Sequence, residues 1–166
     1  IADTVYISAH FIPSSSDINI KSPTDKWTLN TNSPKDSTDK YYMPLTIDGF
    51  DVNFQGFHHI EVQYKASSEA DTRWMNICSF FTDTTYYEEA SGTKEFITGP
   101  TITTRFFGAE DQNYDIRAVT FSKVGNEFVT KESPIITGVK DTKRPVVFGN
   151  IEPADGVLGV NDEIRL

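Results

Sequence analysis

The segment 113–122 constrains the fold of this chain more than any other part of the sequence. Tyr114 and Ile116 fall on one face of an extended backbone, whereas Asp115 and Arg117 fall on the other. This period of two is typical of a β-strand with one buried face and one face in water. The sequence therefore predicts a central strand here.

A hairpin signal follows this strand. Gly125 and Asn126 tolerate positive φ and predict a turn, after which the segment 128–130 begins a return strand. Pro134 lacks a backbone N–H and is expected to interrupt or end that strand. The stretch contains no catalytic motif, so it favours a binding or spacing module over an enzyme.

Further strands are predicted by short alternating or apolar segments, and no window shows a long apolar period of 3.6 residues. These segments are 4–12, 17–20, 27–29, 41–50, 57–65, 74–81, 102–107 and 133–139. Pro44 indicates an edge or a bulge. Residues 30–40 predict a polar loop, and residues 86–90 could form one helical turn. The predicted fold is all-β, an antiparallel sandwich of about seven strands with extra terminal strands.

The charge balance excludes one class of partner. The chain has 15 Lys and Arg against 24 Asp and Glu, and an acidic surface repels a phosphate backbone, so no nucleic acid is expected as a partner. No apolar run is long enough to predict a membrane span, and no leader pattern is visible at the start. Because Ile1 is not an initiator Met, we expect a processed or excised piece of a longer protein.

The sequence predicts no catalytic residue, cofactor or metal ligand. Cys78 is the single cysteine and is interpreted as a buried hydrophobe. His58 and His59 are neighbours on a predicted strand, so they should point to opposite faces and not share a metal ion. The acidic loop 110–115 does not have the spacing of an EF-hand and is interpreted as solvated. Paired carboxylates stay open as an alternative, because any two acids can meet in space.

Aromatic side chains are the better candidates for binding. They could form a platform on which sugar rings stack or a protein partner packs. The alternative for each of them is packing in the core. The candidate ligand-stacking residues are Trp27, Tyr41, Tyr42, Trp74, Tyr86 and Tyr87. Tyr86 and Tyr87 lie in a polar insertion and are the least expected in a core.

Several of these motifs resemble a fibronectin type III module. Ile60-x-Val62-x-Tyr64 resembles its third strand and Trp74-x-x-Ile77 the next, and Tyr114-x-Ile116-Arg117-Ala118-Val119, Gly125-Asn126 and Ser133-Pro134 resemble the sixth and seventh. The resemblance covers roughly residues 17–140 and implies that Tyr114 is a tyrosine-corner residue with a hydroxyl bonded to upstream backbone. It also implies structural roles for Ile116 and Gly125. The sequence departs from the family in lacking a Trp in the second strand and in its longer stretches 30–40 and 82–99.

The end of the chain resembles the opening of a bacterial immunoglobulin-like domain. The residues that carry this likeness are Pro145, Pro153-Ala154-Asp155-Gly156, Gly159-Val160 and Ile164-Arg165-Leu166. We therefore expect an N-terminal strand and linker at 1–16, which a preceding domain could contribute, the module at 17–140, and a truncated second domain at 141–166. Segments 146–148 and 164–166 are expected to pair with 4–12, with the end of the sandwich or with another copy.

Together the two likenesses imply a fragment of a large multidomain bacterial protein that is secreted or attached to the cell surface. The expected function is that of a non-catalytic spacer or docking domain, whose expected partners are neighbouring domains of the same polypeptide. A protein or a glycan is an optional further partner. The alternative is a carbohydrate-binding module. Two or more open, coplanar rings would favour that alternative, whereas buried rings would favour the spacer.

Overall fold

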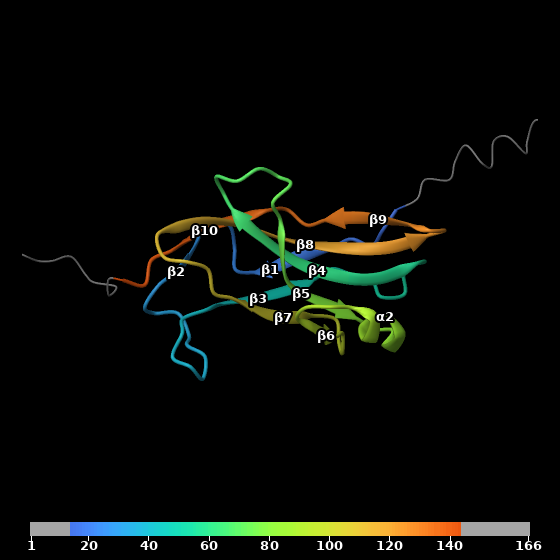
Figure 1. The fold of residues 1–166 in the computed structure, drawn as a ribbon, viewed down its shortest axis with the longest axis horizontal. Helices are drawn as coiled ribbons and strands as arrows, with labels where there is room; N and C mark the ends of the chain where they lie inside the picture. Colours follow the sequence, from blue (N-terminus) through green and yellow to red (C-terminus); the bar gives the residue numbers. More distant parts are fainter. Residues whose placement is uncertain (1–13, 144–166) are drawn as a thin grey trace, which may run out of the picture.

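Alternating apolar residues build two sheets that enclose a common core in a computed structural model, which describes residues 14–143 (Figure 1). The predicted strands 4–12, 146–148 and 164–166, and with them their expected pairing, lie outside the described residues. The elements are β1 (Asn19–Ser22), β2 (Trp27–Leu29), β3 (Met43–Asp48), β4 (Phe57–Ala66), β5 (Met75–Phe81), α2 (Thr84–Glu89), β6 (Lys94–Phe96), β7 (Ile102–Phe106), β8 (Gln112–Val124), β9 (Glu127–Glu132) and β10 (Ile136–Lys140).

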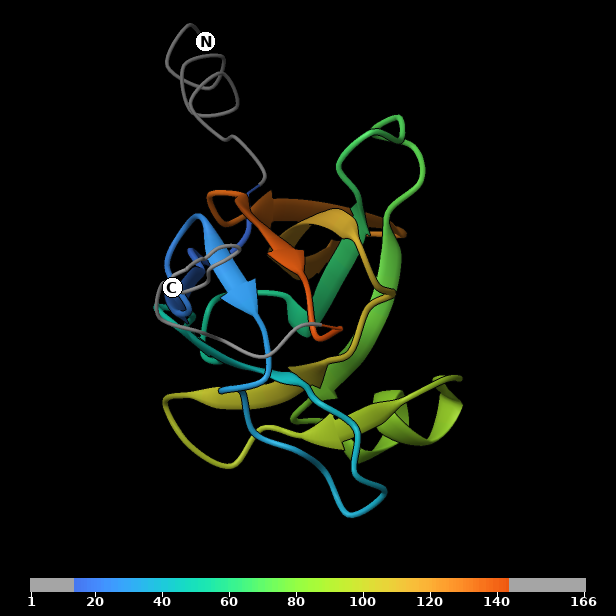
Figure 2. The same cartoon turned by 90° about the vertical axis from the view of Figure 1, so that its left-hand side faces the viewer.

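The all-β sandwich is confirmed, and its strand order is specific. One sheet has the order β1-β3-β7, and the other has the order β2-β10-β8-β4-β5-β6, with β9 beside β8. The pairs β2 with β10 and β5 with β6 are parallel, so the larger sheet is mixed and not wholly antiparallel. Figure 2 looks along the long axis and shows the yellow-green β6 and α2 far from β2 and β10.

The predicted central strand is confirmed as β8, which pairs with β4 on one side and with β9 and β10 on the other. Gly125 takes φ 65° in the turn to β9. Pro134 separates β9 from β10, and Ser133 bridges the break: its N–H donates to the Ala118 carbonyl (2.8 Å) and its Oγ accepts from the Ala118 N–H (3.0 Å). The described part has ten strands instead of about seven, and β6 is the one that no predicted segment covers.

The core lies between the sheets. Its fully buried side chains include Leu29, Leu45, Ile60, Val62 and Ile116. Their burial follows the alternation in the sequence, since each occupies the inward positions of its strand. Within 14–143 no helix is long and apolar enough to span a membrane.

Tyr114 is packed beside the loop that precedes β8. Tyr114 is 7% exposed, and its hydroxyl accepts a hydrogen bond from the backbone N–H of Ala109 at 2.7 Å. Gly108 adopts φ 65° beside the ring, where a Cβ atom would stand 2.9 Å from Tyr114 Cε2. The loop before β8 is therefore tied to the core by this residue.

The predictions for Pro44 and for the short helical turn also agree with the structure. Pro44 pairs with Arg105 of β7, and β1 pairs only with the later part of β3, so Pro44 lies where β3 has one partner strand. The predicted helical turn is α2, whose N-cap Asp83 accepts from the N–H groups of Thr85 and Tyr86. An Asp at this position satisfies N–H groups that the helix leaves unpaired.

The sandwich extends upstream of the predicted boundary at residue 17. Ser15 and Ser16 are buried, and Ser15 Oγ lies 2.7 Å from Ser122 Oγ and 3.2 Å from Thr120 Oγ1. Asp17 forms an ion pair with Lys131 of β9. The first described residues therefore pack against the end of β8 that adjoins the turn to β9.

Candidate functional site

The outward face of the larger sheet carries a continuous series of polar contacts across β4 and β8. The register places Gln63 beside Arg117 and Lys65 beside Asp115. Alternation predicts a solvent-facing position for Asp115 and Arg117, and the same pattern in β4 places Gln63 and Lys65 on that face. In the structure Lys65 is buried and the other three are half-buried. This face is the candidate functional site because its charged groups are held by specific partners.

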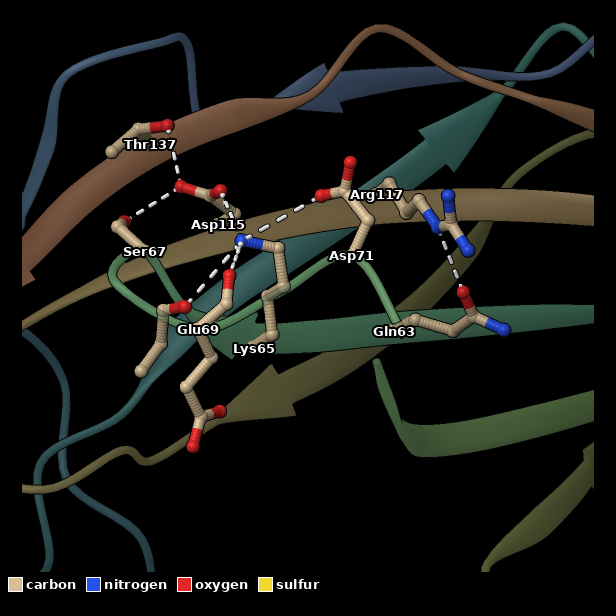
Figure 3. A network of polar contacts seen from close by, with 9 residues as sticks. Gln63, Lys65, Ser67, Glu69, Asp71, Asp115, Arg117 and Thr137 are labelled. Carbon is tan, nitrogen blue, oxygen red and sulfur yellow. Dashed lines mark hydrogen bonds and ion pairs between the residues drawn. The ribbon is translucent and has the colours of Figure 1, made fainter. Parts of the chain in front are cut away.

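Lys65 lies at the centre of the network shown in Figure 3. Its side chain is 4% exposed, and its Nζ donates to Asp115 Oδ2 (3.1 Å) and to the Glu69 carbonyl (3.0 Å). Asp115 Oδ1 also accepts from Ser67 Oγ (2.6 Å) and Thr137 Oγ1 (2.9 Å). These bonds fasten the β4–β5 loop to β8 and β10.

The electrostatics of this network favour a stable ion pair. Burial alone would raise the pKa of Asp115, but the hydrogen bonds from Ser67, Lys65 and Thr137 outweigh burial and lower it. A carboxylate that accepts several hydrogen bonds is stabilised in its charged form. The Lys65–Asp115 pair therefore has the chemistry of a structural clamp, since the Asp115 carboxylate is stabilised in its charged form and both side chains are saturated by partners.

Arg117 is held differently from Lys65. Its Nε donates to Gln63 Oε1 (2.8 Å), and its guanidinium carbon lies 4.2 Å from the centroid of the Trp74 ring. Gln63 in turn donates from Nε2 to Glu61 Oε1 at 2.9 Å. The guanidinium group is thus held by its contact with the indole ring and by one hydrogen bond.

His58 and His59 correct the expectation that they point to opposite faces. Their Nδ1 atoms lie 2.8 Å apart, and their rings are 5.0 Å apart between centroids. The pairing of β4 with β8 changes register between Phe57 and His59, and such a bulge turns two consecutive side chains toward one side. His59 Nε2 lies 3.2 Å from Glu61 Oε2, so the pair continues the polar series of the sheet face.

The histidine pair is enclosed by aromatic rings. His58 stacks on Tyr86 of α2 at 3.8 Å between centroids, and His59 stacks on Phe121 at 4.3 Å. Burial, then the charges of His59 and Lys123, lower the pKa of His58 to about 4. The hydrogen bond to His59 lowers the pKa of Glu61 against the opposing effect of burial. One hydrogen bond between two Nδ1 atoms needs one N–H and one lone pair, so the pair cannot be doubly protonated as it stands.

A cavity of about 530 Å³ opens beside this pair, lined by His58, His59, Glu61, Tyr86 and Glu89 among others. Across the described residues no three His, Cys, Asp or Glu side chains converge in a way that could hold a metal ion. The cavity is therefore a polar recess and has no metal-site geometry.

The predicted aromatic candidates lie in different parts of the molecule. Trp27 is buried in the core and packs edge-on against Phe106. Tyr41 and Tyr42 precede β3, with Lys35 over the Tyr41 ring (4.8 Å) and Arg105 over the Tyr42 ring (4.4 Å). Tyr42 lines a cavity of about 840 Å³ that adjoins β7.

The remaining three candidates are each contacted on their rings. Trp74 lies under Arg117, Tyr86 stacks on His58, and Tyr87 stacks on Phe96 at 4.0 Å. The six rings therefore share no common partner and form no single strip. A sugar platform made of all six is not present.

Cys78 and the acidic loop 110–115, which were considered as a nucleophile and as a metal site, both have structural surroundings. Burial raises the pKa of Cys78 to about 12, so its thiolate is suppressed. In the acidic loop, Glu110 accepts from the Thr142 N–H (2.6 Å to Oε1), and Asp111 pairs with Lys143 at 2.9 Å. This loop binds the segment that follows β10, and its carboxylates do not converge on one point.

Sequence reasoning missed Lys65, Arg117 and the histidine pair as possible site residues. The alternation in β4 and β8 identified the face of the first two, and their cross-strand pairing would have needed the register. The chain matches no protein-family model, no curated protein and no solved structure, so the interpretation of this face rests on its own geometry.

Proposed function

We propose that this chain is a non-catalytic β-sandwich module that spaces or docks the neighbouring parts of a larger extracellular or cell-surface bacterial protein. The observation that carries the proposal is the position of the two ends of the described chain. In Figure 1 it starts, in blue, at one end of the long axis and finishes, in orange-red, at the other.

Residue contacts support this arrangement. Ser15 contacts Ser122 near the end of β8, whereas Thr142 contacts Glu110 just before β8 begins. A strand rises about 3.3 Å per residue, so Gln112 and Ser122 are separated by about 33 Å. Segments joined at the two ends are therefore held apart by the length of the sandwich.

The resemblance to fibronectin type III modules supports the same proposal. The small sheet β1-β3-β7 facing a larger sheet around β4, β8 and β10 agrees with that likeness, as does the hydrogen bond of Tyr114. The short strands β2 and β6, the helix α2 and the parallel pairs are additions to it. A bacterial and extracellular setting is part of the proposal and follows from the resemblance alone.

The carbohydrate-binding alternative receives less support from the geometry. Trp27 is in the core, and the other five rings are covered in part by cations or by other rings. Stacking of a sugar needs an open ring face, and adjacent open rings for an oligosaccharide. The spacing role is therefore the one that we carry forward.

Distance measurements between spin labels would test the proposal on the whole chain. Labels at Ser14→Cys and Lys143→Cys should give one narrow distribution at about 33 Å or more. A control pair at Ser14→Cys and Asn126→Cys, at the same end of β8, should lie at less than half that distance. A broad or short distribution for the first pair would contradict a spacing role, because the module would not hold its ends apart.

A further inference from the structure

The guanidinium group of Arg117 is oriented as if for a ligand, yet it has no anionic partner in residues 14–143. Its central carbon lies 4.2 Å from the Trp74 ring centroid, and its Nε donates to Gln63 Oε1 at 2.8 Å. Gln63 is itself fixed by Glu61. The side chain has therefore already lost much of the rotational freedom that binding would otherwise remove.

The two terminal nitrogens of Arg117 make no hydrogen bond to the described residues, and Figure 3 shows a contact only at Nε. No carboxylate of residues 14–143 lies within 4.0 Å of the group. Trp27 Nε1 is the one buried side-chain nitrogen without a partner in this range, so the terminal nitrogens of Arg117 reach solvent. Lys65, two residues from Gln63 in β4, is saturated by contrast.

The surroundings of Arg117 restrict the kind of anion that fits. Three acids, Glu61, Asp71 and Glu132, act on its charge from a distance without pairing with it. They would repel a phosphate or a polyanion more strongly than a group with a single charge. A carboxylate has one charge and two coplanar oxygens, which match the parallel N–H bonds of a guanidinium.

Apolar surface lies beside the charged group. The register of β10 with β8 ends at the pair of Ile136 with Ile116, and Ser133 is bonded to Ala118. Ile135 therefore lies in the short segment that passes Arg117, and it is 48% exposed. Trp74 is half-buried, and its ring centroid lies 4.2 Å from the Arg117 guanidinium carbon and 5.5 Å from Lys65 Nζ. Arg and aromatic residues next to exposed aliphatic surface are typical of the centre of protein interfaces.

We propose that Arg117, Trp74 and Ile135 form a docking surface for a partner protein, in which the terminal nitrogens of Arg117 bind the carboxylate of one Asp or Glu side chain. Apolar residues flanking that carboxylate pack on Trp74 and Ile135. The surface is separate from the ends of the sandwich, so this inference does not depend on the spacing role. A docking failure and a spacing failure would be distinguished by different measurements.

Nuclear magnetic resonance on the full 166-residue chain would test the surface. The probe is an acetylated, amidated peptide of sequence Ala-Leu-Glu-Leu-Ala, compared with the peptide that has Gln in place of Glu. We expect the acidic peptide to shift the Arg117 Nε–H and Trp74 Nε1–H resonances and the Gln peptide to leave them unchanged. Equal shifts with both peptides, or no shift with either, would overturn the proposal.

Matched variants separate the orientation of the guanidinium from net charge. Arg117→Gln should weaken binding of the acidic peptide at least tenfold, whereas Arg105→Gln, which removes the cation over Tyr42, should change it less than twofold. Arg117→Lys keeps the charge but loses the two parallel N–H donors of the guanidinium group, and should weaken binding several-fold. Equal effects of Arg117→Gln and Arg105→Gln would show that only net charge matters and would refute the site.

Gln63→Ala tests the positioning role of Gln63. It leaves all charges in place but frees Arg117 Nε, so binding should weaken several-fold while the circular dichroism and melting midpoint stay close to those of the parent. Unchanged affinity would contradict that role. A glucuronate disaccharide that shifts Arg117 while the peptide does not would assign the surface to acidic sugars and overturn the choice of a protein partner.

Discussion

The hydroxyl of Tyr114 accepts a hydrogen bond from the backbone N–H of Ala109, 2.7 Å away, across the turn that leads into β8. The ring of Tyr114 is packed edge-on against Phe106 at 4.9 Å between centroids. One side chain thus joins the loop to the contact between the two sheets. This arrangement fixes the start of the strand that carries Asp115 and Arg117.

Replacing Tyr114 by Phe should destabilise the protein by about 1 kcal/mol, because the backbone N–H of Ala109 would lose the acceptor that the partly buried Tyr114 hydroxyl provides. Chemical unfolding monitored by fluorescence would measure the change. Tyr64→Phe is the control, since the Tyr64 hydroxyl makes no hydrogen bond within the described residues. Equal losses in the two variants would contradict the specific role of the Tyr114 hydroxyl.

The strands on either side of this turn could be predicted because their signals are local. The alternation of Tyr114, Asp115, Ile116 and Arg117 decides both the strand and its buried face. The turn at Gly125 is local as well. Such features depend on the backbone preferences of a few consecutive residues, so a single sequence contains them.

Other features depend on pairing between distant segments and could not be predicted. The parallel pairing of β2 with β10 depends on the approach of Trp27 to Gly138, which are far apart in the chain. The meeting of His58 and His59 depends on a bulge against β8, and alternation alone predicts the opposite. The burial of Lys65 likewise needs Asp115 at the matching register position.

Gly138 should tolerate no side chain, because Trp27 lies directly against it. A Cβ atom at this position would be 2.0 Å from Trp27 Cδ2 and 2.3 Å from its backbone oxygen. Gly138→Ala should therefore cost about 3 kcal/mol, the upper part of the usual range for overpacking. Gly99→Ala is the control, since a Cβ there has no neighbour within 4 Å. A melting midpoint unchanged by Gly138→Ala would show that β2 can separate from β10 at little cost.

Removal of the Lys65 ammonium should be costly because Asp115 would keep its charge in a largely enclosed place. Lys65→Met should destabilise the protein by about 3 kcal/mol, the scale of breaking a buried ion pair by deleting one partner. Lys35→Met, which breaks an exposed pair with Asp39, should leave stability almost unchanged, because water solvates both charges. Similar small losses in both variants would mean that water solvates Asp115 well enough to replace Lys65.

The stability of the folded state should depend on pH through His58. Burial, then the charges of His59 and Lys123, lower the pKa of His58 from its ordinary value of 6.5 to about 4, so the unfolded state binds more protons between these values. Stability rises with pH wherever the unfolded state binds more protons. The contribution of neutral His58 is therefore complete above pH 6.5 and is lost as the pH falls toward 4. Urea midpoints measured at intervals from pH 7.5 to 4 should decrease through this window.

Glu61 and Asp115 stop stabilising the folded state at a lower pH than His58 does. The loss of stability due to His58 can therefore be measured separately from the loss due to the carboxylates. The pKa values of Glu61 and Asp115 are lowered from 4.5 and 3.8, so their contributions are present above those values and are lost as the pH falls below them. His58→Gln should flatten the profile between pH 6.5 and 4.5 and leave the steeper decrease below pH 4.5. Tyr86→Phe, which keeps the ring that stacks on His58 and adds no titration in this range, should retain the slope of the parent. If His58→Gln keeps the full slope above pH 4.5, another group titrates there, and the contact between the two Nδ1 atoms does not control acid stability.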